Sequence, residues 1–366
     1  MRTPGVYVEE ISSGVRTIAP APFVTALVGT CDQGPLDAPT EISGLADFTR
    51  TFGPPAGDLA RAVSHFFQNG GGRAVIVRAS ALPGSATGAT GIYALDAVPS
   101  LGTLVLPGQD DPALQATALA YAQARHALYV LDLPADANTI AAGETWLAAH
   151  PELRKPNAAA FIPRVLASDK DGQIKPMPNS GAVAGIIART DSWRGIWKAP
   201  AGIEATISGV SGLDGDTAHF AERLNPLGLG SLRAMTDGPV VWTARTLAGA
   251  DQFGSEWKYV PVRRTALFIE QSVSLGLAWA VFEPNDERLW AQVRLNVGAF
   301  MQGLFRQSAF QGETPPKAYF VKCDASTMTA ADIADGRLNL EIGFAPLKPA
   351  EFVILRISQL TGQAAT

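Results

Sequence analysis

Short apolar runs alternate with helical patterns through the first half of the chain. In the segment 58–68, for example, Leu59, Val63 and Phe66 recur at helical spacing, and Asn69-Gly70 ends the pattern. We expect strands at 23–28, 74–77, 104–106, 128–133 and 158–162, and helices at 58–68, 112–125 and 138–150. Because strands and helices alternate, the predicted fold class is an α/β layer structure.

The second half contains longer helical patterns. In 286–307, Leu289, Val293 and Val297 recur every three or four positions, which predicts a helix with one face in a core. We further expect a connection at 163–180, helices at 181–190 and 263–280, a loop at 193–202, and strands at 239–247 and 338–344. The chain has 366 residues, more than one hydrophobic core usually supports, so two domains are predicted.

Both ends of the chain carry strand patterns that have no partner nearby in sequence. Residues 5–11 are rich in β-branched and aromatic side chains, and residues 351–357 form a similar run after Pro346 and Pro349. An unpaired strand exposes backbone N–H and C=O groups, which another strand, from the same or another molecule, can pair. The ends therefore indicate assembly.

The composition of the chain argues against several classes of function. Hydrophobic residues make up 47% of the chain, charged residues 17%, and the formal net charge is -5, so nucleic acid binding is not expected. Cys31 and Cys323 lie far apart, which fits a reducing compartment. We expect no secretory signal and no insertion into a membrane, because the longest apolar stretch, 275–282, is too short. The protein is expected to be made in the cytoplasm.

The histidines are read as structural. His65 lies within a predicted helix, His126 and His150 end helices, and His219 stands in a polar, helical-looking stretch. A cation near a helix C-terminus interacts well with the helix dipole, and no nucleophile motif accompanies any of the four.

Asp110, Asp111 and Asp132 are the strongest catalytic candidates. Asp132 ends a predicted strand, where α/β sheets commonly bind ligands, and three carboxylates could hold Mg²⁺. The alternative, which we favour, is that Asp110 or Asp111 caps the helix at Pro112 and Asp132 starts the turn at Pro134. A metal-dependent α/β hydrolase or phosphatase is therefore kept as the runner-up to a non-enzymatic protein.

Two glycine-rich segments are read as turns. The run 69–73 follows a helix and precedes a strand, which reverses the order that a phosphate-binding loop requires. The segment 228–230 lacks the third glycine of a dinucleotide fingerprint. No cofactor is expected.

Several segments in order resemble one family, the contractile phage tail sheath proteins. They are Thr3-Pro4-Gly5-Val6-Tyr7-Val8-Glu9-Glu10, Val28-Gly29-Thr30 with Gln33-Gly34-Pro35, Phe67-Gln68-Asn69-Gly70-Gly71, Gly195-Ile196-Trp197-Lys198-Ala199-Pro200, Leu224-Asn225, Val241-Trp242-Thr243-Ala244-Arg245-Thr246-Leu247, Tyr259-Val260-Pro261-Val262-Arg263-Arg264, Phe282-Glu283-Pro284-Asn285 and Pro346-Leu347-Lys348-Pro349-Ala350-Glu351-Phe352. One departure is Thr243, where the family suggests glycine. The resemblance runs nearly end to end, and the chain is short for the family.

The resemblance implies a sheath subunit that polymerises helically around an inner tube and contracts to drive the tube through a target envelope. It implies an N-terminal arm (1–20), an outer α/β domain (21–188), an inner, tube-proximal domain (189–345) and a C-terminal arm (346–366). The implied partners are further copies of the chain, the inner tube protein, and baseplate and terminator proteins. The particle would be a phage tail, an R-type bacteriocin or an extracellular injection system; a ring-forming terminator is the structural alternative.

The resemblance also implies that the arms pair with strands on neighbouring subunits. The residues expected to pair are Val6, Tyr7, Val8, Glu9, Phe352, Val353, Ile354, Leu355, Arg356 and Ile357. Bending is expected at the arm hinges Gly14, Pro20, Pro22, Pro346 and Pro349. Pairing of the arms within their own subunit remains the alternative. Asp332, Asp335 and Glu341 are candidates for facing a basic tube.

Overall fold

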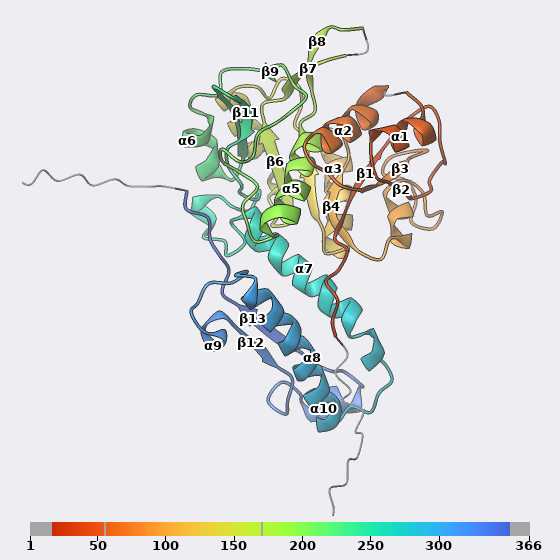
Figure 1. Ribbon diagram of the computed structural model, residues 1–366, viewed down its shortest axis with the longest axis vertical. Helices are drawn as coiled ribbons and strands as arrows, with labels where there is room; N and C mark the ends of the chain where they lie inside the picture. Colours follow the sequence, from red (N-terminus) through yellow and green to blue (C-terminus); the bar gives the residue numbers. More distant parts are fainter. Residues whose placement is uncertain (1–16, 55, 170, 352–366) are drawn as a thin grey trace, which may run out of the picture.

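Six of the predicted strands lie in one eight-stranded mixed sheet, which also contains two strands that the sequence analysis did not predict, at 40–42 and 230–235 (Figure 1). The computed structural model describes residues 17–54, 56–169 and 171–351. In sheet order the strands are β11 (Gly238–Val241), β10 (Gly230–Met235), β6 (Ala158–Ile162), β5 (Leu128–Leu131), β4 (Leu101–Val105), β1 (Val24–Gly29), β3 (Ala74–Arg78) and β2 (Thr40–Ile42). The strands from β10 to β3 run parallel, and the edge strands β11 and β2 are antiparallel to their neighbours. The predicted α/β fold is confirmed.

Helices cover both faces of this sheet, which explains why its central strands are apolar throughout. On one face lie α1 (Leu45–Phe52), α2 (Gly57–Gln68) and α5 (Ser180–Arg194). On the other face lie α3 (Pro112–Ala124), α4 (Ile140–Ala149), α6 (Phe220–Leu224) and the 3₁₀ segment η1 (Gly91–Ala97). The shorter 3₁₀ segments are η2 (Pro151–Leu153), η3 (Asn225–Leu227), η4 (Asp251–Phe253) and η5 (Ala278–Ala280).

The region predicted as a plain connection, 163–180, contains two strands. β7 (Val165–Ser168) and β8 (Ile174–Met177) form an antiparallel hairpin, and β9 (Gly212–Leu213) pairs with β7. The hairpin escaped prediction because Pro, Lys, Asp and Gly dominate its sequence, and an exposed hairpin needs few apolar residues. The predicted strand 239–247 is likewise shorter, since β11 ends at Val241.

A long buried helix, α7 (Val260–Gly276), connects the large sheet with a smaller unit (Figure 1). The Gln271 side chain attaches α7 to the start of β4: its Nε2 donates to the Leu101 carbonyl at 2.7 Å, and its Oε1 accepts from Ser100 Oγ at 2.7 Å. Arg264, also on α7, forms a bidentate pair with Asp191 of α5, with both distances 2.6 Å. These contacts fix α7 against the larger body.

The smaller unit has its own hydrophobic core. It contains α8 (Glu287–Arg306), α9 (Pro315–Ala318), α10 (Ala330–Ala334) and the antiparallel pair β12 (Tyr319–Lys322) and β13 (Glu341–Phe344). The predicted stripe of α8 is buried as expected, and Asp286 caps the helix by accepting a hydrogen bond from the Leu289 N–H at 3.0 Å. Ile18, near the start of the described chain, also packs into this core.

The large sheet extends past the predicted domain boundary at residue 188. β10 and β11 lie beyond that residue but form one edge of the sheet, so the two cores divide along α7 instead. Periodicity could not reveal this, because a strand's sequence does not show which sheet it joins. Whether the two units lie outside and near a tube stays a prediction. Within the described ranges, no helix has the length and apolarity to cross a bilayer.

Candidate functional site

The three candidate aspartates do not form a catalytic group. Asp111 caps α3, as expected, by accepting from the Ala113 N–H at 2.7 Å. Asp110 is half-exposed and lies 3.6 Å from Arg164. Asp132 is buried, and its side chain contacts the start of α5 instead of the Pro134 turn. In the described part of the chain, no three His, Cys, Asp or Glu side chains are grouped to hold a metal.

Asp132 is instead a structural acceptor between two segments. Its carboxylate accepts from the N–H groups of Asn179, Ser180 and Gly108 and from Ser180 Oγ, at 2.5–3.1 Å. Burial raises the pKa of Asp132, and the hydrogen bonds and the charge of Arg164 oppose that rise. The arrangement holds α5 against the end of β5, with no free position for a substrate.

Asp132→Asn is therefore expected to lower the free energy of unfolding by roughly 2–4 kcal/mol, because an amide N–H₂ would face buried donors that then lack an acceptor. Urea denaturation of the purified chain measures this. Asp110→Asn is the matched control, since Asp110 is half-exposed, and should change stability by less than about 0.5 kcal/mol. A stable Asp132→Asn protein that loses a metal-dependent hydrolytic activity would instead support the enzyme alternative.

The histidines lie in structural positions. His65 is buried in α2, His126 follows α3, where its Nδ1 lies 2.7 Å from Glu270, and His150 caps the end of α4. His219 precedes α6 and does not lie within a helix. The glycine run after α2 is a helix end, as expected: the Gly70 and Gly71 N–H groups return to carbonyls of α2.

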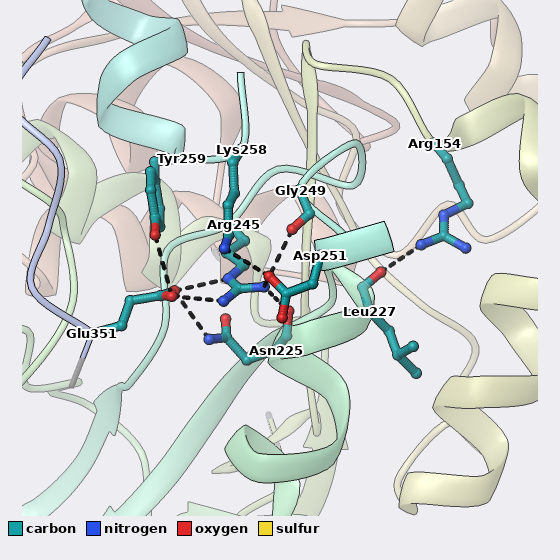
Figure 2. Close-up of polar contacts among 9 residues, drawn as sticks. All are labelled: Arg154, Asn225, Leu227, Arg245, Gly249, Asp251, Lys258, Tyr259 and Glu351. Carbon is teal, nitrogen blue, oxygen red and sulfur yellow. Dashed lines mark hydrogen bonds and ion pairs between the residues drawn. The ribbon is translucent and has the colours of Figure 1, made fainter. Parts of the chain in front are cut away.

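The root of the C-terminal arm is anchored in the larger body. From β13 the chain passes Pro346 and Pro349 and reaches Glu351, which lies beside Arg245 (Figure 2). We call residues 345–351 the C-terminal strap. Arg245 Nε and Nη2 donate to the two carboxylate oxygens of Glu351 at 2.8 and 2.6 Å (Figure 2). The strap therefore links the smaller unit to the larger body at a second point besides α7.

Arg245 is the centre of a buried polar network. It is 1% exposed, and its Nη1 also donates to the carbonyls of Asn225 and Gly249 and to Asp251 (Figure 2). Burial alone would lower the pKa of Arg245, but the paired carboxylates raise it. Burial would raise the pKa of Glu351, yet the hydrogen bonds from Arg245 and Asn225 hold it below its usual value. The pair is ionised at neutral pH.

The root of the N-terminal arm is anchored at the smaller unit. Ile18 is 3% exposed and lies against Gly276 at the end of α7. The Ala21 N–H donates to Ser272 Oγ at 2.9 Å, and the Phe23 ring packs edge-on against Phe268. Residues 17–23 therefore run along α7 from the smaller unit toward β1 (Figure 1).

The predicted hinges differ in their surroundings. Pro20 and Pro22 are exposed; Pro20 lies between the anchored residues Ile18 and Ala21, and Pro22 directly follows Ala21. Pro346 forms an isolated bridge with Phe310. Gly14 and the predicted pairing residues Val6, Tyr7, Val8, Glu9, Phe352, Val353, Ile354, Leu355, Arg356 and Ile357 lie outside the described residues.

The hairpin β12–β13 has two strand edges without a partner in the described chain. Tyr319 pairs with Phe344 and Lys322 with Glu341, and no further strand is paired to either side. Its inner face, including Val321 and Ile342, packs on the core around α8. Two strands alone are only marginally stable in water, and unpaired strand edges expose backbone N–H and C=O groups.

The acidic candidates lie near this hairpin. Asp332 caps α10 through Thr329 and pairs with Arg337 at 2.9 Å; this bonding lowers the pKa of Asp332. Asp335 also pairs with Arg337, at 2.8 Å, and Glu341 lies 4.0 Å from Lys322. Their charges are thus partly balanced by neighbouring cations.

A groove of about 1070 Å³ lies between the larger body and the C-terminal strap. Trp197, Trp242 and Tyr259 line it together with alanines and residues 347–351 of the strap. Arg233, whose guanidinium lies 4.8 Å from the centre of the Trp242 ring, adds a cation. Sequence reasoning missed both this groove and the Arg245 network. One signal in the sequence could have revealed the network: Arg245 is a lone arginine in an apolar stretch, and a buried arginine requires a carboxylate partner.

Comparisons with known proteins agree with this architecture. The family described as "Phage tail sheath C-terminal domain" matches residues 253–359, the part that contains α7 and the smaller unit. A sheath complex of an extracellular contractile injection system, PVC, in the contracted state superposes with a TM-score of 0.81 at 27% identity, covering 99% of this chain and 98% of that chain. The contracted helical sheath of the anti-feeding prophage, AFP, gives 0.78 at 28% identity, covering 98% and 99%.

A more distant structure shows the same fold. The sheath tail protein of Desulfitobacterium hafniense superposes with a TM-score of 0.60 at 13% identity, covering 87% of this chain and 94% of that chain. A comparison with curated protein sequences found no match. These similarities cover the larger body and the smaller unit together.

Proposed function

Since the chain belongs to the contractile sheath family of phage tails and phage-like injection systems, we propose that it polymerises helically around an inner tube and shortens to drive the tube through a target envelope. The family is structural and non-enzymatic. The working unit is then the polymer, and the monomer contributes surfaces for assembly.

The observation that carries this proposal is the antiparallel pair β12–β13, which has no further strand on either edge among the described residues; only Phe310 and Gln311 pair with 345–346, beyond the end of β13. We propose that terminal segments of neighbouring subunits add to these edges as further strands, which gives main-chain hydrogen bonds across the contact. The acceptor hairpin and the donated ends are different surfaces of one chain. Such a head-to-tail contact that does not close on itself generates a helical filament.

The anchored roots of the arms support a mechanism in which subunits move as rigid bodies. Ile18 and Glu351 hold the two roots to different parts of the subunit, so both roots would move with the subunit that carries them. On contraction, subunits would rotate and slide into a shorter, wider lattice while the added strands stay paired. Pro20, Pro22, Pro346 and Pro349 would then keep each root extended rather than serve as the sole pivots.

We place the smaller unit next to the tube and the larger body outside it. Asp335 and Glu341 are the more exposed of the acidic candidates, and we propose that they face a basic tube surface. Asp332 contributes less, because its carboxylate is used by Thr329 and Arg337.

Further partners follow from the similar proteins. One AFP structure is a helical sheath and another is a baseplate, each matched over nearly the whole chain. We propose that this chain likewise contacts a baseplate at one end of the sheath and a terminator at the other. Assembly would take place in the bacterial cytoplasm, and the particle would carry the sheath to its target.

Negative-stain electron microscopy tests the proposal. The full chain, expressed with the inner tube protein of the same particle, is expected to form striated cylinders. Discrete rings without cylinders would favour a ring-forming tail protein instead. A protein that stays monomeric at high concentration in the presence of the tube would contradict both.

A further inference from the structure

The loop between α7 and α8 carries an exposed aromatic side chain on a strained backbone. Phe282 is 102% exposed with φ of 69°, and Val281 beside it is 63% exposed. A non-glycine residue at positive φ costs on the order of 1–3 kcal/mol, and such strain is concentrated at functional positions. In a monomer, an exposed Phe282 ring on a strained backbone contributes nothing to stability.

The loop is nevertheless held firmly. The Asn285 Nδ2 donates to the Arg337 carbonyl at 2.9 Å, and the Asn285 Oδ1 accepts from Trp290 Nε1 at 2.7 Å. The Glu283 N–H returns to the Ala280 carbonyl at 3.2 Å. Phe282 therefore projects from an ordered base, so docking it elsewhere would cost little conformational entropy.

The groove beside the C-terminal strap has matching chemistry. Its volume of about 1070 Å³ is at the upper end of the roughly 300–1,000 Å³ typical of ligand pockets, and its walls include Trp197 and Trp242. Arg233 and Lys348 at the groove form no ion pair within the described ranges. Glu283, next to Phe282, also has no ion-pair partner in the described chain. An aromatic ring and a carboxylate on one surface thus complement aromatic walls and cations on the other.

The two surfaces cannot meet within one subunit. Tyr259, at the groove, directly precedes α7, whereas Val281 and Phe282 follow the end of α7. Seventeen residues of helix separate them by about 26 Å. The loop of one copy can therefore reach the groove only of another copy, so the contact joins two different surfaces and is head-to-tail.

We propose that Val281–Glu283 of one subunit dock into the groove of a neighbouring subunit, with Phe282 against Trp197 and Trp242 and Glu283 near Arg233. This rests on the proposed helical assembly and adds a side-chain contact to the paired strands. A single aromatic anchor in a pocket commonly dominates the free energy of such an interface.

Photo-cross-linking tests the position of the loop. Phe282 is replaced by benzoylphenylalanine, assembled cylinders are irradiated, and the linked peptides are mapped by mass spectrometry. The expected product is a dimer that joins residue 282 to 197–202 or 233–244 of another copy. A link to residues 1–16, a link to the tube protein, or no link at all would overturn the proposed contact.

Charge reversal tests the pairing. Glu283→Arg and Arg233→Glu are each expected to reduce the pelleted polymer about tenfold, and the double variant should recover most of it. Glu152→Arg, an equal charge change at an exposed site in the larger body, is the matched control. If the double variant loses as much pelleted polymer as the single variants, Glu283 and Arg233 do not pair across the contact. If the wild-type chain forms cylinders but the cross-linker at residue 282 does not reach the groove, only this contact is refuted. If the wild-type chain forms no cylinders, the sheath function itself is refuted.

Discussion

A variant that lacks residues 1–12 is expected to fold and yet fail to form sheath-length cylinders. The first buried contact of the described chain is made by Ile18, so the deletion leaves both cores intact. What it removes is a segment proposed to pair with an edge of β12–β13 in a neighbouring subunit, and without it that edge stays open. Sedimentation and negative-stain images measure the loss.

Backbone pairing can be separated from chain length with point variants. Val6→Pro with Val8→Pro removes two N–H donors and is expected to mimic the deletion. Val6→Thr with Val8→Thr keeps those donors and the β-branched shape, so it should still assemble. Full-length cylinders from the truncated chain, or equal behaviour of the proline and threonine pairs, would show that the segment pairs within its own subunit or not at all.

Arg245→Ala is expected to lower the free energy of unfolding by about 3–5 kcal/mol, because it removes the charged partner of the Glu351 carboxylate and the donor to the Gly249 carbonyl in a buried site. The Asn225 amide and the Tyr259 hydroxyl still donate to Glu351, but neither is charged. The C-terminal strap should also become sensitive to protease at 345–351. Urea denaturation and limited proteolysis measure the two effects.

A control variant at an exposed ion pair and the pH dependence of the free energy of unfolding show whether the effect comes from the buried Arg245–Glu351 pair. Arg223→Ala breaks an exposed pair with Glu144 and should cost no more than about 1 kcal/mol. Because the pKa of Glu351 is lowered from 4.5 in the folded chain, the pair stabilises fully above pH 4.5, and this stabilisation is lost as the pH falls through the lower, folded value. Glu351→Gln should abolish that acid-range loss. Equal stability of Arg245→Ala and Arg223→Ala would contradict the anchoring role.

Local patterns predicted the individual elements well where burial was simple. β1, β3, β4, β5 and β6 are largely apolar and buried on both faces, and the stripe of α8 has one buried side, so local patterns alone identified them. β2 was not predicted, because it has only three residues and carries the exposed Glu41. The hairpin β7–β8 was missed, because each strand has only four residues and β8 is exposed except for Met177. The boundary at residue 188 could not have been placed correctly from pattern, since β10 joins β6 across a long separation in sequence.

The sequence by itself predicted the α/β class and carried the motifs that resemble sheath proteins, because both depend on the local order of side chains. Only the tertiary structure decided which segments, distant in sequence, lie together and which lie apart. It brought Arg245 to Glu351 across more than a hundred residues, placed the open hairpin β12–β13 on the smaller unit, and set Phe282 and the groove at opposite ends of α7. Such contacts arise from packing between distant segments, which no local pattern encodes.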